Sequence, residues 1–278
     1  MCSQRPPYKG EQWRYLSCDS RMRRLDQGEF CDTFSPLNPP VLKIEPGETV
    51  SVSFPDGVGG AVKTGNDRMP FLMNSSRSQV RWNPTAGPIY VEGAEKGDTL
   101  SVKVQDITID AEQGRAILRP PFDLAFTLLE PPDYKVKICP IRSGRISFKD
   151  GIEVPVTPSI GCIGTAPSYG AIPTSDAGRH GGNIDVPEIR KGSTIYLPVF
   201  VRGGLLQIGD AHAWQPQGEL TAVDVPATVT LTIELINNKQ INWPRIESEE
   251  YLMSINTSSP IERAIHTGLA EISLWLGE

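Results

Sequence analysis

The sequence predicts a mainly β fold, a β-sandwich that ends in one short C-terminal helix. Three observations support this prediction. The 278 residues include 26 glycines and 25 prolines, which is typical of a chain with many turns. A pattern of a tight turn followed by a strand occurs three times, and convincing helical spacing of apolar residues occurs only once. A chain of this length can also bury a large core.

The recurring pattern is seen in "EPGETVSVSF" (residues 45–54), "EKGDTLSVKV" (95–104) and "RKGSTIYLPV" (190–199). Each copy has a glycine, a small polar or acidic residue, a threonine and then apolar residues at alternate positions. Glycine tolerates the positive φ of a tight turn, and the alternation gives the following strand one buried face. The copies are too loosely spaced for a solenoid, so they indicate repeated strand entry in a sandwich. The expected inward residues are Val50, Val52, Phe54, Leu100, Val102 and Val104.

Further strands are expected in the second half of the chain. "TIYLPVFV" and "GGLLQIG" indicate two buried strands joined by a hairpin-like return, the second of which ends at Asp210 and His212. "ATVTLTIELI" (227–236) alternates like the earlier strands. Its expected inward residues are Val229, Leu231, Ile233 and Leu235.

The predicted helix is the tail "SSPIERAIHTGLAEISLWLGE" (258–278). Ser259 can cap it, Pro260 suits the first helical position, and Glu262 completes a capping box. His266 lies off the apolar stripe, so we expect it on the surface. The stripe itself should be covered by the sheet or by another subunit, which predicts a homo-oligomer. Its members are Ile261, Ile265, Leu269, Ile272 and Leu276.

Composition and charge exclude several classes of protein. The net charge is −6, the pI is near 5.3 and the basic residues are scattered, so we expect no nucleic-acid partner. We expect no membrane partner either, because no apolar stretch has the length of a membrane span and the first thirty residues contain no signal-peptide core. The cysteines are odd in number, widely spaced and without a CxxC pair, which favours reduced thiols in a cytoplasmic protein. They are Cys2, Cys18, Cys31, Cys139 and Cys162.

The chemistry is expected between residues 161 and 219. "GRHGGNID" is a glycine-rich loop that carries His180, Asn183 and Asp185, and "GDAHAWQPQGEL" follows a buried strand. Adjacent glycines let the backbone approach a ligand or simply form a bend, so the loop by itself leaves a site and a plain turn equally open. Asp210 and His212 are two residues apart and would face the same side of a strand. The candidate residues are His180, Asn183, Asp185, Asp210, His212 and Glu219.

Several motifs occur in an order that resembles the acetamidase/formamidase family: "NPTAGPIYVEGAEKGDTLSV", "GCIGTAP", "GRHGGNID", "KGSTIYLPVFVRGGLLQIGDAHA" and "GEL". The resemblance extends from about Pro39 to the end of the chain. It implies an amidohydrolase that splits a short linear amide, of the formamide or acetamide type, into ammonia and a carboxylate. It also implies a β-sandwich of the jelly-roll type with a second β-rich part, and a bound divalent metal, zinc as the first choice and calcium as the alternative.

The sequence departs from the family in three places. After "GDAHA" it reads "WQPQGEL", so bulky Trp214 and the pair Gln215 and Pro216 alter the rim of the site and put the size of the substrate in question. Family members usually continue beyond the last helix, so an end at Glu278 indicates a truncated or lost tail. The first thirty residues match no segment of the family.

Amide hydrolysis needs a nucleophile, a group that polarises the carbonyl and a proton for the leaving amine. Carboxylates and an imidazole suit a metal ion that activates water. We interpret Asp185, Asp210 and His212 as metal ligands or groups that orient this water, so His212 also counts as catalytic. Glu219 is then the general base, and Asn183 donates to the developing oxyanion.

The remaining residues of this region keep two interpretations. His180 is either a further metal ligand or a residue that shapes the pocket. A left-handed turn at Asn183 and a helix cap at Asp185 are the structural alternatives to their chemical roles. Cys162 in "GCIG" lies in an apolar run, so we interpret it as a packed thiol rather than a nucleophile.

Two other functions stay open at this point: hydrolysis of a cyclic amide (a lactam), and a non-catalytic β-sandwich that binds a metabolite. The predicted organisation has four parts. They are an N-terminal segment (1–36), an N-terminal half of the sandwich (37–135), a β-rich half that carries the site (136–244) and a C-terminal helical segment (245–278).

Overall fold

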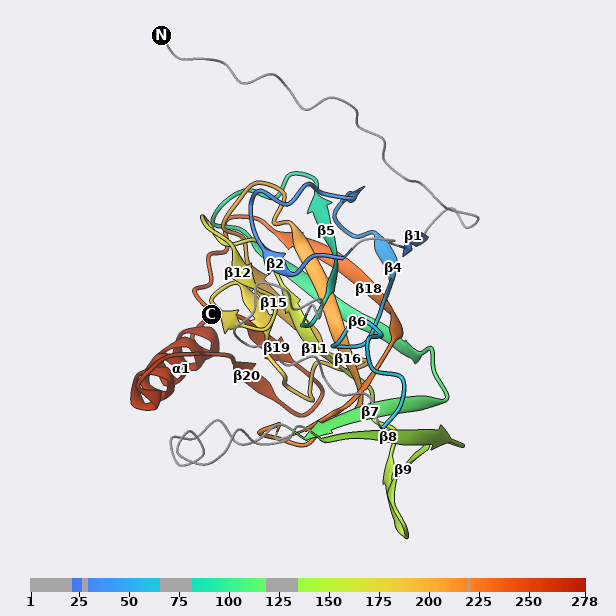
Figure 1. Cartoon of the computed structure of the whole chain (residues 1–278). Coiled ribbons are helices and arrows are strands. Elements are labelled where there is room, and N and C mark those ends of the chain that lie inside the picture. Colours follow the sequence, from blue (N-terminus) through green and yellow to red (C-terminus); the bar gives the residue numbers. More distant parts are fainter. Residues whose placement is uncertain (1–21, 27–29, 66–81, 119–134, 220) are drawn as a thin grey trace.

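The computed structural model describes residues 22–26, 30–65, 82–118, 135–219 and 221–278. Two large β-sheets, a two-stranded sheet and one C-terminal helix make up this part of the chain (Figure 1). The prediction of a mainly β protein with a short C-terminal helix is confirmed. Cys2, Cys18 and most of the predicted N-terminal segment lie outside the described residues.

The first sheet has seven strands, and its centre is formed by the segments that the recurring pattern predicted. In spatial order the strands are β1 (Met22–Asp26), β4 (Thr49–Phe54), β18 (Ala227–Ile236), β6 (Thr99–Ile109), β15 (Thr194–Pro198), β19 (Arg245–Glu247) and β20 (Leu252–Ser254). All neighbours are antiparallel except β1 and β4.

The turn before each recurring strand has the predicted backbone. Gly47, Gly97 and Gly192 have φ values of 89°, 100° and 93°, a region that glycine enters without a steric penalty. The alternation that follows buries one face of β4, β6 and β18 as expected. Leu235 is an exception, because it is only half-buried near the end of β18.

The second sheet has eleven strands and carries the candidate site. Nine form a continuous path: β10 (Ile152–Pro155), β9 (Arg145–Lys149), β8 (Lys135–Arg142), β7 (Gln113–Leu118), β17 (Val223–Val225), β16 (Leu206–Trp214), β11 (Ser159–Gly164), β14 (Gly181–Asn183) and β13 (Ala177–Gly178). Outside this path, β5 (Thr85–Val91) pairs with β16 and with β3 (Leu42–Ile44). A separate two-stranded sheet joins β2 (Thr33–Phe34) to β12 (Ile172–Pro173).

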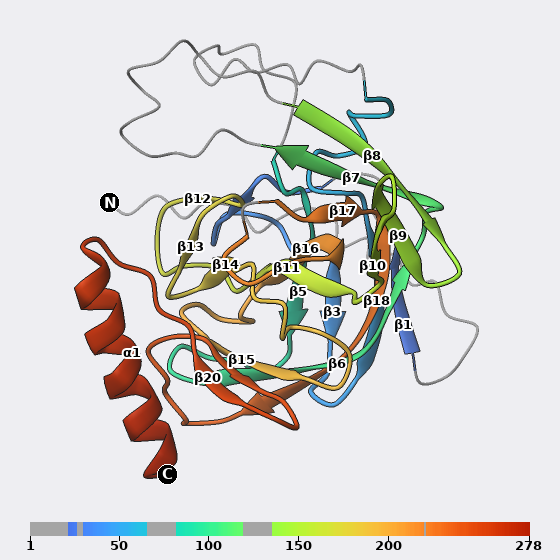
Figure 2. The same cartoon turned by 90° about the horizontal axis from the view of Figure 1, so that it is seen from below.

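One hydrophobic core fills the space between the two sheets. Figure 2 shows β11, β14 and β16 on one side of it and β6 and β15 on the other. Val52, Val102 and Leu231 of the first sheet and Ile160 and Ile208 of the second belong to the same cluster of fully buried side chains. Burial of each such side chain stabilises the fold by about 1.5–3 kcal/mol. Both large sheets contain strands from before and after residue 135, where we expected one half of the chain to end and the next to begin. The boundaries of the four predicted parts remain predictions.

The helix α1 (Ile261–Leu276) differs from the prediction at its start and in the face that it buries. Pro260 is its N-cap rather than its first helical residue, and no side chain caps it, so the expected start and the expected caps by Ser259 and Glu262 are wrong. The predicted apolar stripe points mostly to solvent, whereas Glu271 is buried. His266 is exposed, as expected. The exposed members of the stripe are Ile261, Ile265, Leu269 and Leu276.

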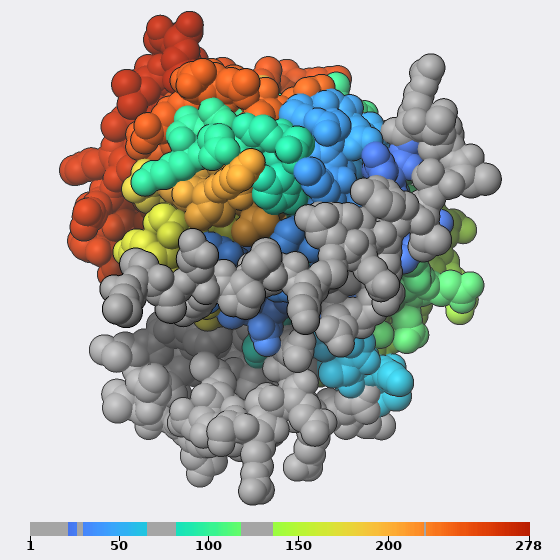
Figure 3. Space-filling view, turned by 90° about the horizontal axis from the view of Figure 1, so that it is seen from above, coloured from blue at the N-terminus to red at the C-terminus, as the bar shows by residue number. Residues whose placement is uncertain are grey.

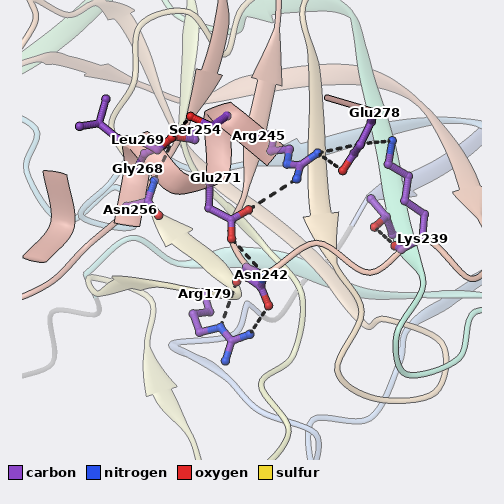
Figure 4. A network of polar contacts seen from close by, with 12 residues as sticks. Arg179, Lys239, Asn242, Arg245, Ser254, Asn256, Gly268, Leu269, Glu271 and Glu278 are labelled. Atoms are coloured by element: carbon purple, nitrogen blue, oxygen red, sulfur yellow. Dashed lines mark hydrogen bonds and ion pairs between the residues drawn. The ribbon is translucent and has the colours of Figure 1, made fainter. Parts of the chain in front are cut away.

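A buried polar network explains why the helix turns this face outward. Figure 4 shows Glu271 between two partners: Asn242 donates to it at 3.0 Å and the Arg245 guanidinium lies 3.5 Å away. Arg245 also donates to Glu278 and lies over the ring of Trp275. Since a buried carboxylate needs such partners, the network orients α1 with Glu271 toward the protein and the apolar stripe toward solvent. The helix lies at the edge of the molecule (Figures 2 and 3).

Cys139 and Cys162 are free thiols, consistent with the expectation of reduced thiols. Among the residues that the structure describes, no helix is long and apolar enough to cross a bilayer.

Candidate functional site

Strand β16 supplies two polar side chains to a buried site. Asp210 and His212 are almost inaccessible to solvent, with exposed fractions of 4% and 1%. They lie on the same side of the strand, with His212 Nε2 3.5 Å from Asp210 Oδ1. The sequence led us to expect that the strand ends at these residues, but β16 continues through them to Trp214.

The glycine-rich loop reaches these residues by a route that the sequence did not predict. Strands β15 and β16 belong to different sheets, so the expected hairpin-like return between them is wrong. Strand β11 lies between β16 and β14 instead. Just after β14, the backbone N–H groups of Ile184 and Asp185 both donate to the Gly161 carbonyl of β11. This contact brings Asp185 beside Asp210 and His212.

A hydrogen-bonded chain holds the Asp185 carboxylate. Asn83 Nδ2 donates to Asn183 Oδ1 at 2.5 Å, and Asn183 Nδ2 donates to Asp185 Oδ2 at 2.6 Å. A carboxylate oxygen of Glu219 lies within 4.8 Å of ligand atoms of Asp185 and His212. The structure therefore places Asn183, Asp185 and Glu219 together. The left-handed turn considered for Asn183 is not observed, because Asn183 lies in β14 and its φ is not positive. The helix cap considered for Asp185 is not observed either, because no helix begins directly after it.

A further carboxylate comes from Asp224 on β17, next to β16 in the sheet. Asp224 Oδ1 lies 3.7 Å from His212 Nε2, and Asp224 is 7% exposed. It was not among the predicted residues. A lone carboxylate within the otherwise apolar "AVDV" was the signal that could have indicated it, because an unpartnered buried charge is costly.

Gln215 joins the two parts of the site. Its Oε1 lies 2.8 Å from His212 Nδ1, and its Nε2 donates to the Asp185 backbone carbonyl at 2.5 Å. The sequence indicated Gln215 only as an altered rim position, and no local pattern pointed to these partners. Trp214, another altered position, forms an edge contact with Phe148 of β9.

The electrostatics of the site are dominated by its carboxylates. Burial by itself lowers the pKa of His212, but Asp210, Asp224 and Asp185 outweigh this effect and hold the pKa well above its usual value. Burial also raises the pKa of Asp185, and the nearby Asp210 and Glu219 raise it further. Among the described residues, no lysine or arginine forms an ion pair with Asp185 or Asp210. The site is thus rich in negative charge that a bound cation would compensate.

Two glycines leave space beside these side chains. A Cβ at Gly161 would lie 2.7 Å from both Asp185 Oδ1 and His212 Cε1. A Cβ at Gly57 would lie 2.5 Å from Asp210 Oδ1. Neither glycine has a positive φ. Glycine is needed at both positions because a larger side chain would collide with Asp185, Asp210 or His212. Asp185 Oδ1 is buried and has no hydrogen-bond partner, which leaves an acceptor directed into this space.

His180 and Cys162 lie at the margin of the site. The His180 ring forms an edge contact with Phe34 at 4.9 Å, and burial lowers its pKa to about 4. His180 is not part of either group of ligand atoms described below, so its role as a ligand remains a prediction. Cys162 donates to the Thr174 carbonyl, and burial raises the pKa of its thiol well above the usual value. A protonated, packed thiol is a poor nucleophile.

Two groups of side chains have the composition and spacing of metal-binding groups. Asp185, His212 and Glu219 form one, and Asp210, His212 and Asp224 form the other; within each, the potential ligand atoms lie within 4.8 Å of one another. His212 is common to both. Imidazole and carboxylate are the ligands that zinc takes in proteins, and carboxylates also suit calcium.

The fold and this site define a mainly β protein with a buried carboxylate–histidine centre. A model of the Acetamidase/Formamidase family matches residues 19–174 and 168–261. The expectation that the first thirty residues match no segment of the family is therefore wrong from residue 19 onward. The chain belongs to this family.

Individual proteins show the same likeness. A formamidase of Methylophilus methylotrophus is 27% identical over 273 residues, which cover 76% of this chain and 65% of that protein. The structure of an acetamidase from Yersinia enterocolitica is 35% identical with a TM-score of 0.83, over 89% of this chain and 77% of that one. An acetamidase from Bacillus halodurans is 29% identical with a TM-score of 0.82, over 91% and 84%. The chain spans 65% of the length of the curated formamidases that it matches.

Proposed function

We propose that the protein is an amidase that hydrolyses a short linear amide, of the formamide or acetamide type, with the help of a divalent metal ion. The observation that carries this proposal is the buried cluster of Asp185, Asp210, His212, Glu219 and Asp224. The names of its relatives, formamidase and acetamidase, support the choice of substrate.

The side chains present fit a metal ion. Asp185 Oδ1 is buried without a hydrogen-bond partner, and the space that a Gly161 side chain would fill lies next to it. The donor set of one imidazole and several carboxylates favours zinc over calcium. Asp185, Asp210, His212 and Asp224 would hold the ion. When bound, such an ion lowers the pKa of a water molecule and polarises a carbonyl group.

The protein's own groups account for the remaining needs of the reaction. Glu219 is the proposed general base, since its carboxylate lies within 4.8 Å of ligand atoms of Asp185 and His212. The Asn183 amide nitrogen uses one N–H on Asp185, and its second N–H is the proposed donor to the developing oxyanion. The proton taken up by Glu219 is then available to the leaving amine.

The test of this proposal is the release of ammonia from formamide and acetamide, measured beside the metal content of the purified protein. We expect turnover that falls on treatment with a chelator and returns on addition of zinc. Glu219→Gln keeps the shape of the side chain but removes the base, so turnover should fall by roughly 10²–10⁴-fold while bound metal persists. Turnover of Glu219→Gln equal to that of the parent would contradict the assignment of the base.

We also propose that the protein is a cytoplasmic homo-oligomer in which a second copy covers the exposed apolar stripe of α1. Ile261 and Leu276, at the two ends of the helix, are 69% and 70% exposed. The Glu271 network fixes the helix with this stripe outward, and a contiguous apolar patch of this kind is typical of an interface. The free thiols of Cys139 and Cys162 favour a reducing compartment.

A further inference from the structure

We infer that Gln215 is a positioning residue that fixes the tautomer of His212, so that Nε2 is the nitrogen presented to the carboxylates. This inference deepens the proposed function and rests on it, since the tautomer matters most if His212 binds a metal ion. Gln215 itself touches neither the proposed metal nor the substrate in this scheme. It acts through His212 and Asp185.

The orientation of the Gln215 amide follows from its two partners. Its nitrogen lies 2.5 Å from the Asp185 carbonyl oxygen, which can only accept a hydrogen bond. The reversed amide would place two acceptor oxygens against each other. Gln215 is only 5% exposed, so water does not readily compensate such a reversal. Oε1 therefore faces the His212 ring.

This orientation determines where the ring proton lies. Oε1 of an amide accepts but cannot donate, and it lies 2.8 Å from His212 Nδ1. Nδ1 must carry a proton for this contact to be favourable. In the neutral ring Nε2 is then unprotonated, and its lone pair points toward Asp210 Oδ1 at 3.5 Å and Asp224 Oδ1 at 3.7 Å. An unprotonated ring nitrogen among carboxylates is what a metal ion requires.

Gln215 also connects the ring to the second group of ligands. The carbonyl that it holds belongs to Asp185, whose φ of 51° is uncommon for a residue other than glycine. One buried amide thus fixes the tautomer of His212 and restrains the backbone of Asp185. Gln215 and Asp185 are 30 residues apart in the sequence, so this hydrogen bond holds two separate segments of the site together.

Three variants separate this role from ordinary packing. Gln215→Met keeps the length of the side chain but removes both hydrogen bonds. Gln215→Glu keeps an acceptor for Nδ1–H and loses the donor to Asp185. Gln217→Met is the matched control, because Gln217 is an exposed neighbour whose side chain donates to Glu188 outside the proposed ligand groups. Zinc dissociation constants are measured with a competing chelator, and the ring protons of His212 by ¹⁵N–¹H correlation NMR.

We expect His212 of the parent to carry its single proton on Nδ1, in the zinc-loaded protein and in the metal-free protein at a pH where the ring is neutral. Gln215→Met should lose this preference and bind zinc about 10–100-fold more weakly. Gln215→Glu should keep the Nδ1–H form, and Gln217→Met should resemble the parent in both measurements.

A parent protein with the proton on Nε2, or a Gln215→Met variant with the parental tautomer and zinc affinity, would overturn the inference. A parent that binds no zinc would contradict the proposed metal instead. In that case the spectrum of the metal-free protein still decides the role of Gln215.

Discussion

Asn83, Asp185 and Asp210 share a left-handed backbone conformation, with φ values of 48°, 51° and 56°. This conformation is uncommon for residues with a side chain, although asparagine and aspartate tolerate it best. Each such residue costs on the order of 1 kcal/mol or more, and strain of this kind gathers at functional sites. Half of the six described non-glycine residues with positive φ lie in the candidate site. In the candidate site, therefore, the backbone adopts less stable conformations that place the side chains of Asn83, Asp185 and Asp210.

A methyl group at Gly161 should disturb the site more than the fold. In Gly161→Ala the new Cβ would lie 2.7 Å from Asp185 Oδ1 and His212 Cε1, so these side chains must separate. We expect a large loss of bound metal and of amide turnover, with a loss of about 1–3 kcal/mol in the free energy of unfolding. Gly65→Ala is the control, because its Cβ meets only ordinary contact with Val136. Parental metal content and turnover in Gly161→Ala would show that this space is not used.

Cys162 should tolerate replacement. Its thiol is fully buried and donates to the Thr174 carbonyl, so Cys162→Ala removes packing and one weak hydrogen bond. We expect turnover within a few-fold of the parent and a loss of about 1–2 kcal/mol in unfolding free energy, measured by urea denaturation. Complete loss of turnover by a folded variant would instead indicate a thiol nucleophile.

Sequence reasoning at the residue scale found the members of the site that lie in recognisable motifs. Asp210 and His212, two apart on one strand, and Asp185 on the glycine-rich loop lie together in the structure. It missed Asn83, Gln215 and Asp224. Their partners lie on other elements, and the contact between Asn83 and Asn183 spans 100 residues. Alternation and turn chemistry report only neighbours along the chain, so they carry no signal for such contacts.

At the scale of elements, the alternation of apolar residues correctly predicted which faces of the strands are buried. The apolar stripe of the C-terminal helix wrongly predicted which face of that helix is buried. Strands β4, β6 and β18 bury the predicted faces because a sheet has one face on the core. In α1 the same apolar argument failed, because the ion pair and hydrogen bonds of Glu271 decide which face contacts the sheet. A buried charge with good partners overrides the helical pattern, and no spacing rule foresees those partners.

The Arg245 network should therefore matter more for stability than ion pairs on the surface. Arg245→Met leaves Glu271 buried without its cation, and we expect a loss of about 3–5 kcal/mol in unfolding free energy. The matched control is Arg145→Met, which breaks the exposed pair with Glu153 and should cost less than about 1 kcal/mol. Urea denaturation of both variants measures the difference. Equal, small losses would mean that packing alone holds the helix.

At the scale of the whole molecule, the exposed stripe of α1 predicts self-association. Ile265→Lys with Leu269→Lys places two charges in the stripe, where these residues are 54% and 60% exposed. We expect light scattering to give an oligomer for the parent and a folded monomer for the double variant. Ala270→Lys, an exposed position outside the stripe, should leave the oligomer intact. A parent that is a well-folded monomer would contradict the prediction.

Strand β18 lies between β4 and β6, and Thr49 and Thr232 bond across a separation of 183 residues. During synthesis, β4 and β6 therefore emerge well before the strand that pairs with both. At about 5–20 residues per second, more than a hundred intervening residues take on the order of ten seconds to appear. Throughout that interval β4 and β6 each have an open edge where β18 will pair, so we expect the nascent chain to need protection from aggregation until β18 arrives.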